Sequence, residues 1–253
     1  MKIISVVNQK GGTAKTTTLI NLSAYLARFG KKVLIIDLDP QANASSGLGV
    51  SAENRDKGIY EILSGKIPLT EGLIEVRKNF WLIPANENLA GANIEIVNLE
   101  DREFLLTKAL KPLAEDFDFV FFDTPPSLGL MTINSLVASS SVLIPVQAEY
   151  FALEGLGQLL NTINLIKENL RPDLSVLGAI LTMYDTRGKL SADVWEELYK
   201  FFPHKIYRTV IPRNVYLAEA PSYGKTILEY APRSRGAKAY HRLAREFVLH
   251  NNN

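Results

Sequence analysis

The feature that most constrains the fold is a glycine-containing loop near the start of the chain. The loop, KGGTAKTT at 10–17, follows an apolar run at 3–7 and leads into a helical run at 16–29 that Gly30 closes. Glycines let backbone N–H groups close around phosphate oxygens, and the first turn of a helix carries a partial positive charge that favours an anion. The order strand, loop, helix therefore predicts a phosphate-binding turn. A glycine-rich turn without a ligand is the alternative.

The side chains of the loop suit a nucleotide bound together with a metal ion. Lys15 is placed to contact the β and γ phosphates, the Thr16 hydroxyl can bind Mg²⁺, and Thr17 can help to hold the α phosphate. The usual pattern G-x-x-x-x-G-K-[ST] is met only in part, because Gln9 and Ala14 stand where it has glycine. We expect nucleotide contacts from Lys10, Gly11, Gly12, Thr13, Ala14, Lys15, Thr16 and Thr17.

Apolar runs of strand length alternate with helical stretches along the chain. The predicted strands are at 3–7, 33–38, 119–122, 142–146, 176–181 and 206–211, and the predicted helices are at 16–29, 101–115, 153–170 and 191–201. Continuous apolar runs are typical of strands that are covered on both faces. The sequence therefore predicts an α/β fold with a doubly wound, mainly parallel sheet and helices on both faces.

The chain is predicted to form one domain over 1–253. A length of 253 residues with 47% hydrophobic content is enough for a substantial core. The glycine-bearing stretch 41–100 is expected to hold loops and short elements. We expect Asn251–Asn253 at the terminus to be disordered.

Composition excludes several classes of protein. Charge is nearly balanced, with 28 Lys and Arg against 27 Asp and Glu, so any contact with nucleic acid must come from a local patch. The lack of cysteine excludes disulfides, thiolate zinc sites and cysteine-bound iron–sulfur clusters. The first apolar run is too short for a signal peptide, and no window reaches the roughly 18 apolar residues of a spanning helix. We expect membrane contact to be peripheral at most.

Three aspartates lie at the ends of two predicted strands. Asp37 and Asp39 end the second strand, directly before Pro40, and Asp123 follows the apolar run at 119–122. Ligands bind at the carboxyl ends of the strands in sheets of this kind. A lone aspartate after four apolar residues fits a carboxylate that holds Mg²⁺ through water, so we expect Asp123 near the metal, with Asp37 close to it. Capping of a turn before Pro40 is the alternative for the first two aspartates.

The loop also resembles a known family. The string KGGTAKT matches the deviant Walker A form K-G-G-x-[GA]-K-[ST] of the P-loop ATPases ParA/Soj, MinD and nitrogenase iron protein. The resemblance implies that Lys10 reaches across a dimer interface to the partner's nucleotide and that Asp39 orients or activates the attacking water. With Lys15, these are the catalytic residues that the resemblance implies. Ala14 departs from the commoner glycine, and its methyl group is a candidate cause of altered loop closure or slower turnover.

The resemblance extends from residue 2 to about residue 248. The segment 211–215 is similar to a Soj-type motif in which a proline and an asparagine contact the adenine ring, so Pro212 and Asn214 are expected to bind the base. A plain turn is the alternative there. Further similar stretches lie at 124–126, 152–156 and 219–225. Their extent favours Soj-like proteins, and the lack of cysteine argues against nitrogenase iron protein.

A local excess of basic residues is a candidate surface for DNA phosphates. The resemblance adds Arg187, at a position where Soj-like proteins often use arginine for DNA. Tyr216 is a departure, because Soj-like chains commonly have arginine there. A solvated basic face is the alternative, and the amphipathic stretch 239–249 leaves a MinD-like membrane helix open. The local excess of basic residues lies between residues 233 and 246 and consists of Arg233, Arg235, Lys238, Arg242 and Arg245.

The resemblance implies a cycle driven by ATP and Mg²⁺. Two protomers close as a homodimer in the ATP state and bind non-specific double-stranded DNA, and a ParB-like partner stimulates hydrolysis to move a chromosome or plasmid. The implied location is the cytoplasm, on the nucleoid, without stable membrane association. We also expect no N-terminal helix-turn-helix domain and hence no operator binding. The alternatives are a MinD-like membrane-cycling ATPase and a scaffold that scarcely hydrolyses ATP.

Overall fold

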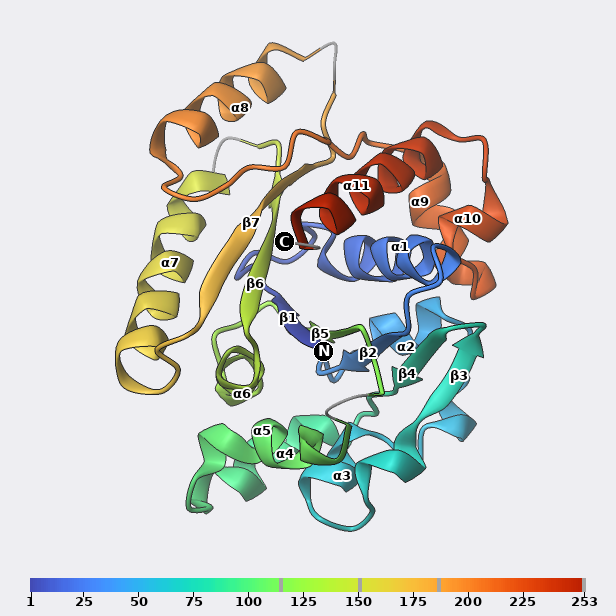
Figure 1. Ribbon diagram of the computed structural model, residues 1–253, viewed down its shortest axis with the longest axis vertical. Coiled ribbons are helices and arrows are strands. Elements are labelled where there is room, and N and C mark those ends of the chain that lie inside the picture. The colour runs from blue at the N-terminus through green and yellow to red at the C-terminus, as the bar shows by residue number, and fades with distance from the viewer. Residues whose placement is uncertain (114–115, 150–151, 186–187, 252–253) are drawn as a thin grey trace.

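A seven-stranded sheet forms the centre of the computed structural model, which describes residues 1–113, 116–149, 152–185 and 188–251 (Figure 1). The strand order is β3-β4-β2-β5-β1-β6-β7. Strand β3 is antiparallel to β4, and the other pairings are parallel. The strands are β1 (Lys2–Val6), β2 (Val33–Asp37), β3 (Ile74–Arg77), β4 (Phe80–Ile83), β5 (Phe119–Asp123), β6 (Ser141–Gln147) and β7 (Ser175–Thr182).

Helices connect the strands and cover the sheet. The α-helices are α1 (Lys15–Arg28), α2 (Asn43–Gly47), α3 (Ile59–Leu63), α4 (Leu89–Glu95), α5 (Leu105–Leu110), α6 (Leu130–Ala138), α7 (Ala152–Asn169), α8 (Lys189–Phe201), α9 (Val215–Glu219), α10 (Ile227–Tyr230) and α11 (Arg235–Asn251). Short 3-10 helices are at Ala52–Asn54, Leu69–Gly72, Ile96–Asn98, Arg102–Phe104, Lys111–Leu113 and Ala220–Tyr223.

Successive residues of the central strands face opposite sides of the sheet, because side chains alternate along a strand. In β2, Val33 and Ile35 pack into a core with α1 and α11, whereas Leu34 and Ile36 pack into a core with α3, α4 and α5. A third core lies between β6, β7 and the helices α6, α7 and α8. Figure 1 shows α1 and α11 side by side over one face and α3 to α6 beyond the other. This arrangement confirms the predicted doubly wound, mainly parallel α/β fold.

The prediction of a strand at 206–211 was wrong. This stretch runs beside β7 but forms only one isolated bridge, between Ile206 and Ala179. Two of its backbone N–H groups donate instead to the Glu246 side chain, from Arg208 at 2.7 Å and from Thr209 at 3.0 Å. A continuous strand ladder is therefore interrupted in the middle of the segment.

Two other local predictions differ from the structure, and a third is confirmed. The predicted helix at 101–115 is divided into two 3-10 turns and α5, and residues 114–115 lie outside the described part. The stretch 41–100 holds loops and short elements, as predicted, and two of these elements form the β3-β4 hairpin at one edge of the sheet. Asn251, predicted to be disordered, ends α11, and its backbone oxygen accepts a hydrogen bond from Lys2 Nζ at 2.6 Å.

Among the described residues, no helix has the length and apolar character needed to cross a membrane.

Candidate nucleotide-binding site

The glycine loop lies at the carboxyl ends of the central strands, between β1 and α1. Gly12 has a φ of 74°, and Ala14, which caps α1, has a φ of 64° and a ψ of 34°. These angles belong to the left-handed region, which glycine enters freely and alanine enters only at a cost. The sequence therefore keeps a methyl group at a position whose backbone favours glycine.

Neighbouring strands hold the loop in place. The Thr182 hydroxyl at the end of β7 donates to the Thr13 carbonyl at 3.0 Å, and Asn8 Nδ2 donates to the Pro145 carbonyl in β6 at 2.7 Å. Asn8 Oδ1 also accepts the Lys10 backbone N–H at 2.9 Å. These bonds fix the backbone of the loop that the sequence predicts to bind phosphate. Sequence reasoning missed Asn8 and Thr182, although Asn8 directly precedes the motif and Thr182 directly follows a predicted strand.

Lys15 is a buried cation at the start of α1. Its Nζ has the Lys10 carbonyl as a partner, at a long 3.4 Å. Burial lowers the pKa of Lys15, and the nearby carboxylates of Asp123 and Asp39 oppose that fall. A buried positive charge at a helix N-terminus suits an anionic ligand.

Thr16 and Asp123 form the polar base of the site. The Thr16 hydroxyl donates to Asp123 Oδ2 at 2.7 Å, while the buried Asp123 Oδ1 has no hydrogen-bond partner in the described part of the chain. Burial raises the pKa of Asp123 well above its ordinary value, and the charge of Asp37 adds to the rise. An unpaired buried carboxylate oxygen beside a hydroxyl is a set of donors that Mg²⁺ prefers, so these residues fit a bound magnesium ion.

Asp37 lies opposite Asp123 in the register of β2 and β5 and is fully buried. Its Oδ2 accepts the backbone N–H and the hydroxyl of Ser45, at 2.9 and 2.8 Å, and its Oδ1 accepts the Asp39 N–H at 3.2 Å. Burial raises the pKa of Asp37 to about 6, and the bonds from Ser45 oppose the rise. Asp37 thus connects the end of β2 to α2.

Asp39 lies two residues beyond the end of β2 and is largely buried. Its Oδ1 accepts the Gln41 backbone N–H at 3.0 Å, which fixes the direction of the carboxylate. The electrostatic effect of Asp39 on Lys15 means that the two charges lie close together. The site therefore combines a positioned carboxylate with the cation of the loop.

A cavity of about 310 Å³ adjoins the start of α1. Pro212 and Asn214 line it, together with Ala14 and Thr17 from the loop and helix. The Asn214 Oδ1 atom is buried without a hydrogen-bond partner among the described residues. An apolar cavity lined by a proline and an asparagine, next to the glycine loop, has the character of a site for a nucleotide base.

Comparisons with known proteins agree with this geometry. A family model described as an AAA domain matches residues 1–176. The chain is 51% identical over 246 residues to the sporulation initiation inhibitor protein Soj of Bacillus subtilis, covering 97% of each chain. It is 51% identical over 245 residues to the chromosome-partitioning ATPase Soj of Thermus thermophilus, covering 97% of this chain and 94% of that protein. The chain belongs to the ParA/Soj family of partition ATPases.

Solved structures extend the family likeness to three dimensions. Two structures of cobyrinic acid a,c-diamide synthase from Mycobacterium smegmatis, one with ADP and magnesium and one with an ATP analogue and magnesium, match with a TM-score of 0.89. Both are 35% identical to this chain and cover 100% of it and 96% of their own chains.

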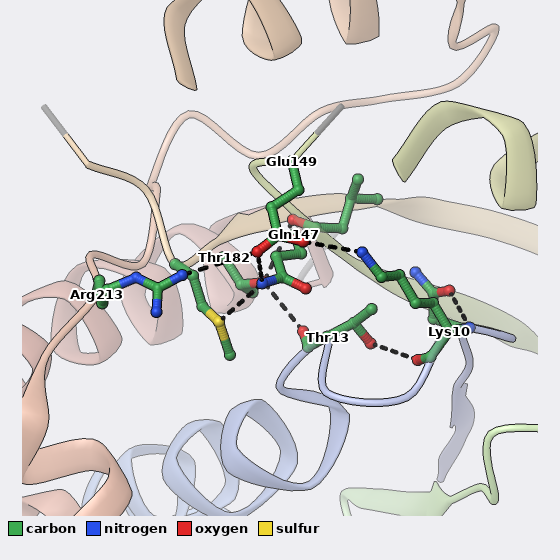
Figure 2. Close-up of polar contacts among 9 residues, drawn as sticks. Lys10, Thr13, Gln147, Glu149, Thr182 and Arg213 are labelled. Carbon is green, nitrogen blue, oxygen red and sulfur yellow. Dashed lines mark hydrogen bonds and ion pairs between the residues drawn. The ribbon is translucent and has the colours of Figure 1, made fainter. Parts of the chain in front are cut away.

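This member of the ParA/Soj family also has a polar cluster that sequence reasoning missed. Lys10 Nζ lies 3.0 Å from Glu149 Oε2, and Arg213 Nη2 lies 3.8 Å from Glu149 Oε1 (Figure 2). Gln147 Nε2 donates to Glu149 Oε1 at 2.6 Å. We call these four residues the Glu149 cluster. Its one signal in the sequence is an acidic residue just after the predicted strand at 142–146.

The predicted DNA residues lie around the last helix. On α11 they are spaced three or four residues apart, so they share one face. Arg28, at the end of α1, lines an open groove together with Lys238 and Arg242, and sequence reasoning missed it. Arg187 lies outside the described residues, and Tyr216 is exposed and packs against Tyr230 at 6.3 Å. The exposed basic residues, none of which joins an ion pair within the described part, are Arg233, Arg235, Lys238, Arg242 and Arg245.

Proposed function

We propose that this chain is a partition ATPase that binds non-specific double-stranded DNA as an ATP-bound homodimer. The observation that carries the proposal is the buried Asp123 Oδ1, which has no hydrogen-bond partner among the described residues and lies beside Thr16, at the base of a loop that also holds the buried Lys15. Such a site is incomplete without a polyphosphate and a divalent cation. Family membership identifies ATP as the nucleotide.

The loop residues 10–17 bind the phosphates of ATP, through backbone N–H groups and the Lys15 ammonium. Magnesium, held by Thr16 and Asp123, neutralises phosphate charge when it is bound. Asp37 stays a prediction for the surroundings of the metal, since its oxygens bond to Asp39 and Ser45. Pro212 and Asn214 bind the adenine in the cavity beside α1.

Hydrolysis requires a base for the attacking water and a cation for the transition state. Asp39 is the proposed residue for the water, because its buried carboxylate is fixed by Gln41 at the carboxyl end of β2. Lys10 is the proposed cation, and it contacts the nucleotide of the partner protomer in the way that an arginine finger does. With Lys15, these residues form the catalytic set.

DNA binding is assigned to the basic face of α11 and its neighbour on α1. A row of exposed cations that form no ion pairs with the described residues can neutralise successive phosphates without reading bases. Closing of two protomers brings two such faces together, so the dimer has more phosphate contacts than the monomer. Hydrolysis separates the protomers and releases the DNA. The face comprises Arg28, Arg233, Arg235, Lys238, Arg242 and Arg245.

The packing of α11 favours DNA over a membrane as the surface that this helix contacts. The apolar side chains of Tyr240, Leu243 and Phe247 have 0% exposure and belong to the core with α1. A helix that binds a membrane interface must present such residues to lipid. The proposed location is therefore the nucleoid, in the cytoplasm, and a ParB-like partner stimulates turnover.

Fluorescence anisotropy with a random DNA duplex tests the proposal. Binding is measured with ATP and Mg²⁺, with ADP, and without nucleotide, over a series of salt concentrations. We expect tight binding only with ATP, and we expect the logarithm of the binding constant to fall linearly with the logarithm of the salt concentration. Lys15→Ala should lose this binding. Equal binding in all three nucleotide states would contradict the ATP switch, and no binding in any state would remove DNA from the function.

A further inference from the structure

In the Glu149 cluster, one carboxylate pairs with two cations that both belong to segments of the candidate nucleotide site. Figure 2 shows Lys10 and Arg213 approaching Glu149 from opposite sides, with Gln147 beneath. Lys10 comes from the phosphate loop and Arg213 from the segment that lines the base cavity. Glu149 therefore connects the two ends of the nucleotide site within a single protomer.

The position of Glu149 is itself fixed. Gln147 is 8% exposed, and its Nε2 donates to Glu149 Oε1 at 2.6 Å while lying 3.3 Å from Met183 Sδ. Gln147 ends β6, an interior strand of the sheet. The carboxylate is thus directed by a rigid element and not by the loop alone.

The pairing of Lys10 with Glu149 is in conflict with the role proposed for Lys10. One ammonium at 3.0 Å from a carboxylate in its own protomer cannot at the same time extend to phosphates bound by another protomer. Both side chains of the pair are partly exposed, at 39% and 42%, so the pair is open to exchange with solvent or with a stronger anion. A bound triphosphate is such an anion.

We propose that Glu149 is a positioning residue that keeps Lys10 folded back in the separate protomer and opposes ATP-driven dimerisation. The inference rests on the proposed function, since it assumes that Lys10 acts across the dimer. Arg213 shares the same carboxylate, so any movement of Arg213 when a base enters the cavity changes the charge that faces Lys10 as well. Base binding and the negative charge that holds Lys10 are therefore coupled through Glu149.

The expected effect is modest because the ion pair is only half buried. Pairs of this exposure correspond to about a twofold to fivefold change in an equilibrium. Glu149→Gln removes the charge, yet its Oε1 can still accept from Gln147, so the local fold is kept. Arg213→Gln removes a cation that shares the Glu149 carboxylate at 3.8 Å, so it should act in the opposite direction, by holding Lys10 more tightly, and less strongly. Glu71→Gln is the matched control, because Glu71 forms an ion pair of similar exposure with Lys57, at 3.1 Å.

The first measurement uses the nucleotide-free protein and does not depend on the proposed function. Lysines are acetylated briefly with a water-soluble N-hydroxysuccinimide ester, and the rate at Lys10 is followed by peptide mass spectrometry. We expect Lys10 to react about twofold to fivefold faster in Glu149→Gln than in the parent or in Glu71→Gln, with the other lysines unchanged. Equal rates at Lys10 would overturn the inference and leave the proposed function untouched.

The second measurement is the ATP concentration at half-maximal dimerisation, by analytical ultracentrifugation with Asp39→Ala in every variant to prevent turnover. Glu149→Gln should lower this concentration about twofold to fivefold at low salt, and the difference should shrink in high salt because ion pairs are screened. If the parent dimerises with ATP and Glu149→Gln needs the same or a higher ATP concentration, the inference is refuted. A parent that never dimerises with ATP would refute the proposed function and, with it, the role in dimerisation.

Discussion

The substitution Asp37→Asn is predicted to change the stability of the nucleotide-free protein in opposite directions at low and at high pH. Burial raises the pKa of Asp37 to about 6 in the folded state, against an ordinary value of 3.8. In the unfolded chain the group has that ordinary value. The folded state therefore binds the proton more tightly, and its stability falls as the pH rises from about 4 through 6.

The magnitude follows from the size of the shift. A rise of about two pKa units corresponds to about 3 kcal/mol of destabilisation once Asp37 is ionised, above pH 7. Asparagine removes this cost. Its Oδ1 can still accept from Ser45, but its NH₂ faces the Asp39 N–H, so a hydrogen bond worth about 1 kcal/mol is lost. The net prediction is a gain of about 2 kcal/mol at pH 8 and a loss of about 1 kcal/mol at pH 3.5.

Urea unfolding of the parent and of Asp37→Asn, in EDTA without nucleotide, measures both values. Asp173→Asn is the control, because this exposed carboxylate should change stability by less than about 0.5 kcal/mol at either pH. If Asp37→Asn were destabilised by the same amount at pH 3.5 and pH 8, the buried charge would not carry the cost that we assign to it.

Three further predictions concern the site and the DNA surface. Ala14→Gly removes the strain of a left-handed alanine at the cap of α1. After the entropic cost of glycine is subtracted, the free energy of unfolding should rise by about 0.5–1 kcal/mol. A lower midpoint in urea unfolding would contradict the strain. Thr16→Val should retain binding of a fluorescent ATP analogue in EDTA but lose the enhancement by Mg²⁺, measured by anisotropy, whereas an unchanged response to Mg²⁺ would remove Thr16 from the metal site. Replacing both Arg242 and Arg245 with glutamine should reduce the slope of log K against log salt for DNA by about two, and an unchanged slope would place the DNA elsewhere.

Much of the fold could be predicted from the order of apolar runs and the glycine loop. The β3-β4 hairpin was missed because its strands have four residues each, and β3 is only partly buried, so neither gives a long apolar run. Asn79, with a φ of 61°, marks the turn between them and was the available signal. The stretch at 206–211 has the composition of a strand, but Glu246 on α11 takes its backbone donors. That contact is tertiary and has no local signature.

The site could be predicted where a motif fixes both residue type and position. The loop, Asp39, Asp123 and the segment 211–215 come from strand ends or from family patterns, and the structure brings them to one edge of the sheet. The Glu149 cluster could not be predicted in the same way, because it joins residues 10, 147, 149 and 213 from three separate segments. Only the order of β1, β6 and β7 in the sheet makes these segments neighbours.

The central claim is that this site hydrolyses ATP and that Asp39 serves the attacking water. Phosphate release from ATP, measured together with particle mass in the same samples of the parent and Asp39→Ala, tests it most directly. We predict that the parent releases phosphate, while Asp39→Ala binds ATP, releases none and accumulates as a particle of about twice the 28.1 kDa protomer mass. Hydrolysis by Asp39→Ala at the parent rate would contradict the account.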